Sequence, residues 1–432
     1  MKNRKALALI AILALVAAAC GGSDGGSDEA VVEVETTEAP ATTEAPTTTA
    51  APAPASDPLI LASLMPLSGD LASLGPGIAL GAALAVEQIN AAGGINGQPV
   101  QLIEGDSGCD GAVALTSLND VIAQGAQGVM GAACSGTSLA ILDTAIAAEV
   151  VMVSPSNTSP QFTKSDKKGF YARTAPSDLL QGDVLASLLV EDGVQTVSII
   201  SRADSYGRGL AEATAAAFEA AGGTVKTIVY HATDASEFTS EVTAVGKGGA
   251  DAIVGILFPE TGCGVLQPAF EQGLLDTPWY MTDGVKDAGL ASLCGLGTAL
   301  DGFKGTAPGS AAGEAKDAFE AAYAEVSADG SPTFIFAPQA YDAVMLMAIS
   351  AAANGVTGPE IASGLVAASS GGEKCIGVAC IALAADGVDV DYVGASGEIE
   401  LNAVGDPTAA TYDIWTTEGD TNPVLKSVDF GS

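Results

Sequence analysis

From Pro58 onward, short apolar runs alternate with longer alanine-rich stretches whose apolar residues recur at helical spacing. The runs are typical of buried strands, and they lie at 59–66, 100–106, 128–133, 150–156, 196–202, 224–230, 252–258 and 278–284. The helical stretches lie at 78–94, 138–149, 179–193, 207–223 and 339–355, and most end at the glycine that a helix C-terminus favours. This alternation predicts β-α-β units around parallel sheets, an α/β fold.

The length and the charge of the chain narrow its function. A chain of 432 residues exceeds what one ordinary core supports, so we expect two lobes and a cleft. Ligands of open parallel sheets bind beyond the carboxyl ends of the strands. The formal charge of −36 repels phosphates, so nucleic-acid binding is not expected.

The first twenty residues have the layout of a secretion signal. Lys2, Arg4 and Lys5 precede an apolar stretch at 6–19, which is too short to cross a bilayer, and Cys20 follows three alanines. This segment resembles a bacterial lipoprotein signal. The resemblance implies that residues 1–19 are removed and that Cys20 is acylated. Cleavage without a lipid is the alternative.

Residues 20–57 are rich in glycine, serine, threonine, alanine and proline and hold too little apolar surface to form a core. This composition predicts a disordered tether at residues 20–57. Together with the lipid, the tether would hold an exported globular body at the outer face of the cytoplasmic membrane or in the cell envelope.

Six further cysteines make disulfides possible in an exported protein. They are Cys109, Cys134, Cys263, Cys294, Cys375 and Cys380. Six cysteines allow 15 connectivities, among which the sequence cannot choose; the nearest-neighbour guess joins consecutive cysteines in turn. A zinc site is not expected, because no CxxC pair occurs and His231 is the single histidine.

Two motifs resemble those of a protease and of a nucleotide-binding protein, but neither lies in the sequence context that such an activity requires. Residues 105–108 read Gly-Asp-Ser-Gly, as around the nucleophile of chymotrypsin-like proteases, but that fold is all-β and its serine follows its histidine in the chain. Here Ser107 precedes His231. The glycines at 75, 77 and 81 miss the dinucleotide-binding spacing, and no Walker motif occurs. We therefore expect neither an enzyme nor a cofactor.

Polar clusters follow two neighbouring predicted strands, at 134–138 and 154–158. Free N–H groups at a helix N-terminus, together with hydroxyls, suit a carboxylate. Ordinary N-capping is the alternative for each cluster. Asp283 ends another strand, where its carboxylate can pair with a ligand ammonium or simply cap a turn.

Residues 59 to about 345 resemble the Leu/Ile/Val-type binding proteins of ABC transporters, which are periplasmic binding proteins of type I and bind branched-chain amino acids. The matching segments, in family order, are 61–103, 131–142, 150–163, 170–182, 201–213, 237–254, 279–285 and 303–308. The Cys109 and Cys134 pair is placed as in the family's N-lobe disulfide. The region after Gly371 matches poorly and is interpreted as a possible insertion.

The resemblance implies a two-lobe fold, each lobe a parallel β-sheet flanked by helices, with a three-strand hinge. The chain would cross near 174–177, 305–307 and, loosely, 392–396. The N-terminal lobe would then hold residues 58–175 and 306–393. The C-terminal lobe would hold 176–305 and 394–432.

The resemblance also assigns the ligand site. Ser135, Ser156 and Thr158 would hold a carboxylate, and Tyr206 and Asp283 would reach the ligand ammonium from the other lobe.

Two further positions would shape the pocket. Phe258 falls where the family commonly has an aromatic lining residue. Leu74 stands at a position where the family often has Tyr or Trp. One wall of the pocket is therefore altered, and the resemblance does not determine which side chain the ligand carries.

The implied function is that of an extracytoplasmic solute-binding protein. It would bind an amino acid or similar zwitterion as a monomer and serve the permease and ATPase of an ABC importer. Alternatives within the fold are a binder of amides, urea or aromatic acids, and a ligand-sensing receptor.

Overall fold

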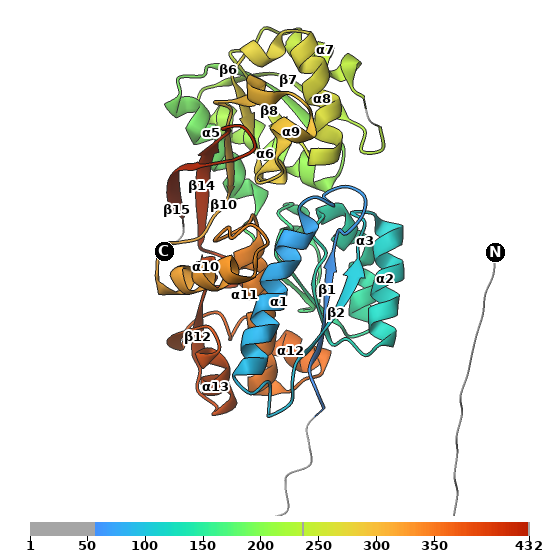
Figure 1. Ribbon diagram of the computed structural model, residues 1–432, viewed down its shortest axis with the longest axis vertical. Coiled ribbons are helices and arrows are strands. Elements are labelled where there is room, and N and C mark those ends of the chain that lie inside the picture. The colour runs from blue at the N-terminus through green and yellow to red at the C-terminus, as the bar shows by residue number, and fades with distance from the viewer. Residues whose placement is uncertain (1–56, 236, 431–432) are drawn as a thin grey trace, which may run out of the picture. The chain divides into compact units, whose positions relative to one another are not determined.

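The computed structural model of the protein describes residues 57–235 and 237–430 (Figure 1). The predicted signal at 1–19, Cys20 and all of the tether except Asp57 lie outside these residues. Within them, no helix combines the length and the apolar character that a membrane crossing requires.

The first sheet is parallel, with the strand order β2-β1-β3-β4-β5. Its strands are β1 (Ile60–Met65), β2 (Gln101–Asp106), β3 (Gly128–Gly131), β4 (Val151–Ser154) and β5 (Tyr171–Arg173). Alternate residues of β1 pack into two different cores, Leu61 and Met65 into one and Ala62 and Leu64 into the other. The sheet is therefore covered on both faces, as parallel sheets require.

Helices far apart in the sequence cover the first sheet. On one face α1 (Gly75–Ala91) lies beside α11 (Ala337–Asn354) (Figure 1). On the other face α2 (Gly111–Ala123) pairs with α3 (Ser135–Ala147). The sheet and these helices form what we call the first lobe.

The second sheet has the order β15-β14-β10-β9-β8-β6-β7 and forms the second lobe. Its strands are β6 (Thr196–Arg202), β7 (Thr224–His231), β8 (Ala252–Ile256), β9 (Trp279–Met281), β10 (Lys304–Pro308), β14 (Ala410–Thr416) and β15 (Val424–Phe430). Strands β6 to β10 pair in parallel, but β14 pairs antiparallel with both β10 and β15. One edge thus departs from the parallel pattern.

The helices of the second lobe are α5 (Asp178–Glu191), α6 (Ser205–Ala220), α7 (Thr239–Gly246), α8 (Pro259–Glu271) and α9 (Leu290–Leu293). A short α4 (Gln161–Lys164) precedes β5, and 3₁₀ turns lie at Leu274–Asp276, Asp283–Val285 and Gly297–Leu300.

The segment after Gly371 is built onto the first lobe. It holds a small sheet of β11 (Glu373–Ile376), β12 (Val390–Gly394) and β13 (Gly397–Glu398), with α13 (Ala379–Ala385). Helices α10 (Glu314–Val326) and α12 (Gly358–Gly364) precede it. Asp342 of α11 anchors this sheet, because its buried carboxylate accepts from the Tyr392 hydroxyl and the Ala395 N–H, both at 2.7 Å.

Among the described residues, the chain passes between the two large sheets at three places, 174–177, 309–313 and 399–409. The last two lie a few residues beyond the positions that the sequence suggested. The lobe boundaries stay a prediction.

All eight strands predicted from the sequence are present. The three disulfides are also the nearest-neighbour pairs, Cys109–Cys134, Cys263–Cys294 and Cys375–Cys380, with Cα atoms 5.5, 5.0 and 5.3 Å apart.

Candidate ligand-binding site

A small cavity lies between residues of the two lobes. Six of the seven predicted site residues line it, and they are Leu74, Ser135, Ser156, Tyr206, Phe258 and Asp283. The lining residues that the sequence did not indicate are Leu71, Ile78, Ala133, Cys134, Gly284 and Phe336. Thr158 does not line it. We call this cavity the cleft.

Asp283 provides a carboxylate at the second-lobe side of the cleft. Asp283 lies in a 3₁₀ turn that follows β9, and the residue is 3% exposed. Its Oδ1 accepts from Gln181 Nε2 at 2.8 Å and from the Tyr206 hydroxyl at 3.0 Å. Burial raises the pKa of Asp283 to about 6, although these two hydrogen bonds partly offset the effect.

Asp178 places a second carboxylate behind the first. Burial, and then the charge of Asp283, raise the pKa of Asp178 well above its usual value. The Thr158 side chain lies beside Asp178 and partly offsets this shift. No lysine or arginine of residues 57–235 and 237–430 forms an ion pair with Asp178 or Asp283. Of the two acids, Asp283 lines the cleft, and a buried carboxylate that has no cationic partner among the described residues favours a cation.

The first-lobe side of the cleft holds hydroxyls and a helix N-terminus. Ser135 opens α3, and the N-cap residue Cys134 makes no side-chain capping bond. The Ser135 hydroxyl oxygen accepts from the Ser159 N–H at 3.4 Å, while the Ser156 hydroxyl donates to the Ala133 carbonyl at 3.1 Å. Because no N-cap side chain covers the first turn of α3, its N–H groups suit a carboxylate.

The apolar walls include two residues in a costly backbone conformation. Leu71 and Phe336 have φ of 63° and 61°, the left-handed region that non-glycine residues rarely adopt. They lie just before α1 and α11. Backbone strain of this kind concentrates at functional sites, where the surroundings hold it.

Carboxylates of the second lobe hold both walls from across the cleft. Glu260 accepts from the Leu71 N–H at 2.8 Å, and Asp287 accepts from the Ile335 N–H at 2.9 Å. An ion pair between Asp70 and Arg202, at 2.7 Å, adds a third link. The cavity inside measures about 20 Å³, which is room for about one water molecule. A larger ligand therefore requires the lobes to separate or the walls to shift.

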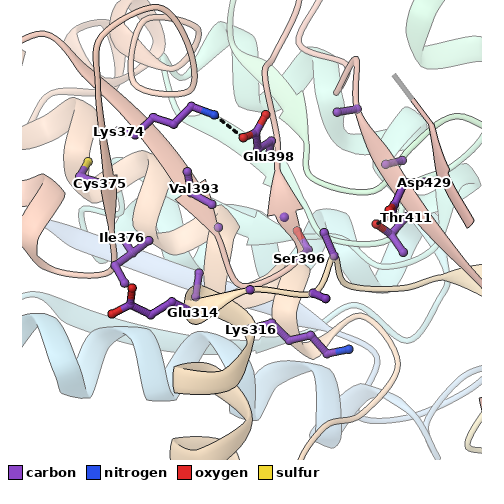
Figure 2. A pocket seen from close by; sticks show the side chains of 18 of the residues that line it. Glu314, Lys316, Lys374, Cys375, Ile376, Val393, Ser396, Glu398, Thr411 and Asp429 are labelled. Atoms are coloured by element: carbon purple, nitrogen blue, oxygen red, sulfur yellow. Dashed lines mark hydrogen bonds and ion pairs between the residues drawn. The ribbon is translucent and has the colours of Figure 1, made fainter. Parts of the chain in front are cut away.

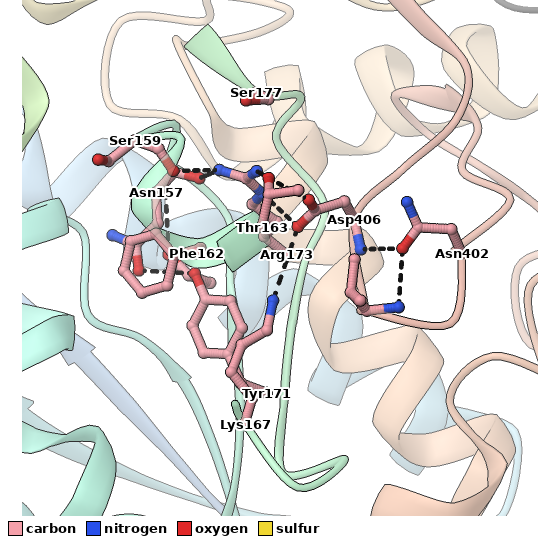
Figure 3. A network of polar contacts seen from close by, with 12 residues as sticks. Asn157, Ser159, Phe162, Thr163, Lys167, Tyr171, Arg173, Ser177, Asn402 and Asp406 are labelled. Carbon is pink, nitrogen blue, oxygen red and sulfur yellow. Dashed lines mark hydrogen bonds and ion pairs between the residues drawn. The ribbon is translucent and has the colours of Figure 1, made fainter. Parts of the chain in front are cut away.

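A buried arginine supports the loop that carries Ser156 (Figure 3). Arg173 Nη1 donates to the carbonyls of Asn157 and Ser159, at 3.1 and 3.0 Å, and its Nε donates to Asp406 Oδ1 at 2.9 Å. This role of Arg173 was not predictable from the sequence, because Asp406 is 233 residues away from Arg173.

A larger hollow of about 570 Å³ lies between α10, the small sheet and the β14–β15 edge (Figure 2). Among its charged and polar groups, Lys374 pairs with Glu398, and the Thr411 hydroxyl donates to Asp429. Of the buried polar atoms without a partner in the described part of the chain, none belongs to a lining residue. Size alone thus does not make it the site.

The protease-like motif forms no catalytic pair. Ser107 is buried beside the first sheet, while His231 ends β7 in the second lobe and its Nδ1 contacts the Ala232 carbonyl.

Two α/β lobes, three crossings and a polar-ended cavity between the lobes are the architecture of a two-lobe binding-protein fold. Residues 58–374 match the profile of a family described as periplasmic binding protein. The chain belongs to the periplasmic binding protein family.

Curated relatives share part of the sequence. An amino acid binding protein of Pseudomonas aeruginosa is 34% identical over 238 residues, which are 53% of this chain and 62% of that protein. The match thus spans under two thirds of that relative. The leucine-, isoleucine-, valine-, threonine- and alanine-binding protein of the same organism is 29% identical over 304 residues, 68% of this chain and 78% of the relative.

Solved structures share the fold. The branched-chain amino acid transporter substrate binding protein LivJ of Streptococcus pneumoniae, in complex with isoleucine, superposes with a TM-score of 0.72 at 22% identity, covering 87% of this chain and 100% of LivJ. A solute binding protein of R. palustris in complex with 4-hydroxybenzoate gives 0.72 at 18% identity, covering 87% and 98%.

Proposed function

We propose that this protein binds a small zwitterion of the amino-acid type in the cleft and presents it to the permease and ATPase of an ABC importer. Family membership and the amino-acid-binding relatives support the transport role. The observation that carries the ligand class is the buried Asp283 carboxylate, which faces the cleft without a cationic partner.

A zwitterion satisfies both sides of the cleft at once. Its ammonium would pair with Asp283 and Tyr206, and its carboxylate would meet the first turn of α3 near Ser135 and Ser156. Each charge costs several kcal/mol to bury unless it is paired, so neither side alone suffices. Because the two sets of partners belong to different lobes, the ligand stabilises the closed form selectively.

The proposal includes export. Residues 1–19 would direct secretion, and the acylated Cys20 with the tether at 20–57 would keep a monomeric binding protein at the outer face of the cytoplasmic membrane or in the cell envelope. Mass spectrometry of the mature N-terminus tests this, since diacylglycerol on Cys20 adds a defined mass. An unmodified N-terminus would remove the anchor from the proposal and leave the ligand site unaffected.

Calorimetry with three related compounds tests the ligand class. Leucine carries both charges, 3-methylbutylamine lacks the carboxylate, and 4-methylpentanoate lacks the ammonium. We expect leucine to bind at least about 100-fold more tightly than either fragment, because each fragment leaves one charged side unpaired. If 4-methylpentanoate binds as well as leucine, Asp283 is not an ammonium partner and the zwitterion proposal is wrong.

An aromatic acid is the second candidate, and one contact favours it. The rings of Tyr206 and Phe258 stack with centroids 5.3 Å apart, and both line the cleft. They offer an aromatic ligand a stacking surface. Native mass spectrometry of protein purified without refolding separates the candidates by the mass of the retained ligand.

A further inference from the structure

A second hollow lies in the first lobe, beside the Arg173 network. It measures about 430 Å³, within the range of small-molecule sites. Three parts of the chain form it, the 163–169 loop with the start of β5, α12 with the two residues after it, and residues 403–405. None of its lining residues lines the cleft. We call it the Lys167 pocket.

Lys167 is the charged group buried in this pocket, and it is 5% exposed. Its ammonium forms an ion pair with Asp406 Oδ1 at 3.8 Å, a distance too long for a hydrogen bond (Figure 3). That oxygen already accepts from Arg173 at 2.9 Å, and Oδ2 accepts from the Thr163 hydroxyl at 2.6 Å. The Tyr171 ring, 5.0 Å from Nζ, gives only a weak cation–π contact.

The titration of Lys167 agrees with this geometry. Burial lowers the pKa of Lys167 to about 8, although the nearby Asp406 carboxylate acts in the opposite direction. An ammonium has three donors, and here the protein satisfies none of them by a hydrogen bond. All three donors are therefore without a hydrogen-bond acceptor, although the ion pair with Asp406 partly compensates the charge.

The rim of the Lys167 pocket is basic in a chain whose formal charge is −36. Lys164 and Lys168 are exposed on the same loop, which has Asp166 as its acidic residue. A concave basic patch concentrates anions near it. Lys164 and Lys168 line the same pocket as the buried Lys167, which favours a bound anion over mere solubility.

The remaining lining decides the kind of anion. Ala362, Leu365 and Val366 supply one apolar wall, and Ala403 and Val404 supply another. The guanidinium of Arg173 already donates hydrogen bonds to Asp406, Asn157 and Ser159, so it cannot also bind an anionic group in a bidentate manner. A single ammonium point charge suits one anionic group carried on a compact apolar body.

We propose that the Lys167 pocket binds a small organic anion, with its carboxylate or phosphate group on Lys167 and its apolar body against α12. This inference does not rest on the proposed amino-acid function, because the two sites share no lining residue.

Amide NMR of the full mature chain locates binding by residue. The ligands are hexanoate and hexyl phosphate, with hexan-1-ol as the neutral control. We expect saturable shifts at the Gly169 and Gly405 amides with both anions and none with the alcohol. Shifts confined to Gly136 and Gly284, which report the cleft, or equal shifts with the alcohol, would overturn the proposal.

Substitution of Lys167 tests its role. Lys167→Met keeps the length of the side chain and removes the charge, and we expect the anion affinity to fall at least about tenfold. Lys374→Met, an exposed lysine in the other hollow, should leave it unchanged. An affinity that is equal in Lys167→Met and the wild type would contradict the site.

A second variant covers the case that Lys167→Met does not fold. Lys164 and Lys168 are exposed, so the double change to glutamine leaves the core intact. It should weaken hexanoate binding by about threefold to tenfold and reduce its salt dependence. An unchanged affinity and salt dependence would again reject the pocket as an anion site.

Discussion

The cleft and the Lys167 pocket each bury a charge, but the two charges are opposite, and of the two only Lys167 has an ion-pair partner, Asp406, among the described residues. The cleft holds the Asp283 carboxylate in about 20 Å³, between residues of two lobes. The Lys167 pocket holds an ammonium in about 430 Å³. The cleft must change shape to admit a ligand, whereas the Lys167 pocket already has the volume of a small molecule. A buried charge that the protein satisfies incompletely thus occurs both in a cavity between the lobes and in a hollow within one lobe.

Arg173 and Asp406 join the two regions. The guanidinium supports the loop with Ser156 on one side, and Asp406 approaches Lys167 on the other. The following predictions change this Arg173–Asp406 connection, or the charges of Asp283 and Lys167, and test whether the cleft and the Lys167 pocket behave independently.

Removing Asp406 should have the largest effect. Asp406→Ala leaves Arg173 and Lys167 buried without their shared carboxylate, and breaking a buried pair in this way costs about 3 to 5 kcal/mol. Urea denaturation should show this loss of unfolding free energy. Asp166→Ala, on the exposed loop nearby, is the control and should change it by less than about 0.5 kcal/mol. A similar stability for both variants would mean that Asp406 does not compensate the two cations.

Removing Asp283 should affect the cleft alone. We expect Asp283→Ala to lower the affinity for leucine by about 2 to 5 kcal/mol, because the ammonium is then buried without its partner. Calorimetry measures this, with the exposed Asp276→Ala as control. The hexanoate shifts at Gly169 should persist in Asp283→Ala. An unchanged leucine affinity would reject the role of Asp283, and a loss of both bindings would show that the sites are not independent.

A structural feature could be predicted from the sequence when it depends on neighbouring residues, and could not when it depends on contacts between distant segments. The eight strands were predictable because each is a continuous apolar run. β5 has three residues and β15 is largely exposed, so neither produces that signal. The antiparallel edge at β14 was equally hidden, since strand order depends on contacts between distant segments.

The residues that line the cleft were predictable where recognisable motifs contain them. Ser135, Ser156 and Asp283 follow strands in recognisable segments, and the structure brings them to one cavity. Thr158 belongs to the same motif but turns toward Asp178. Phe336 and the Lys167 pocket had no such signal. The left-handed backbone conformation of Phe336 cannot be predicted from the residue type, and the pocket is formed by three segments that are distant in the sequence.

The pH dependence of stability should have opposite signs in the two regions. Asp283 in the folded protein has a pKa of about 6, above the usual 3.8, so the folded state keeps a proton that the unfolded state has lost. The unfolding free energy should therefore fall as the pH rises from about 4 to 6, by up to about 3 kcal/mol. Asp342 contributes in the same window, so the measurement is the difference between wild type and Asp283→Asn. Curves that run parallel would show that Asp283 does not titrate in this range.

Lys167 should act the other way. Its folded pKa of about 8 lies below the usual 10.5, so between these values the unfolded state holds the extra proton. The unfolding free energy should rise with pH in that window, and Lys167→Met should lose this rise. Thermal melts at pH 8 and pH 10 measure it; a rise that survives in Lys167→Met would assign it to another group.

The link between Asp70 and Arg202 should give the smallest effect. Asp70 is partly exposed, and Arg202 keeps its contacts with Asp204 and Thr261, so Asp70→Asn should shift the free protein toward the open form by about 0.5 to 1 kcal/mol. Fluorescence energy transfer between dyes on the two lobes measures the closed fraction. Glu191→Gln breaks an exposed ion pair within the second lobe, with Lys426, and is the control. Because the Lys167 pocket needs no lobe movement, its hexanoate affinity should be identical in Asp70→Asn. A change there would mean that closure reaches the Lys167 pocket through Arg173, and the two regions would then be one coupled system.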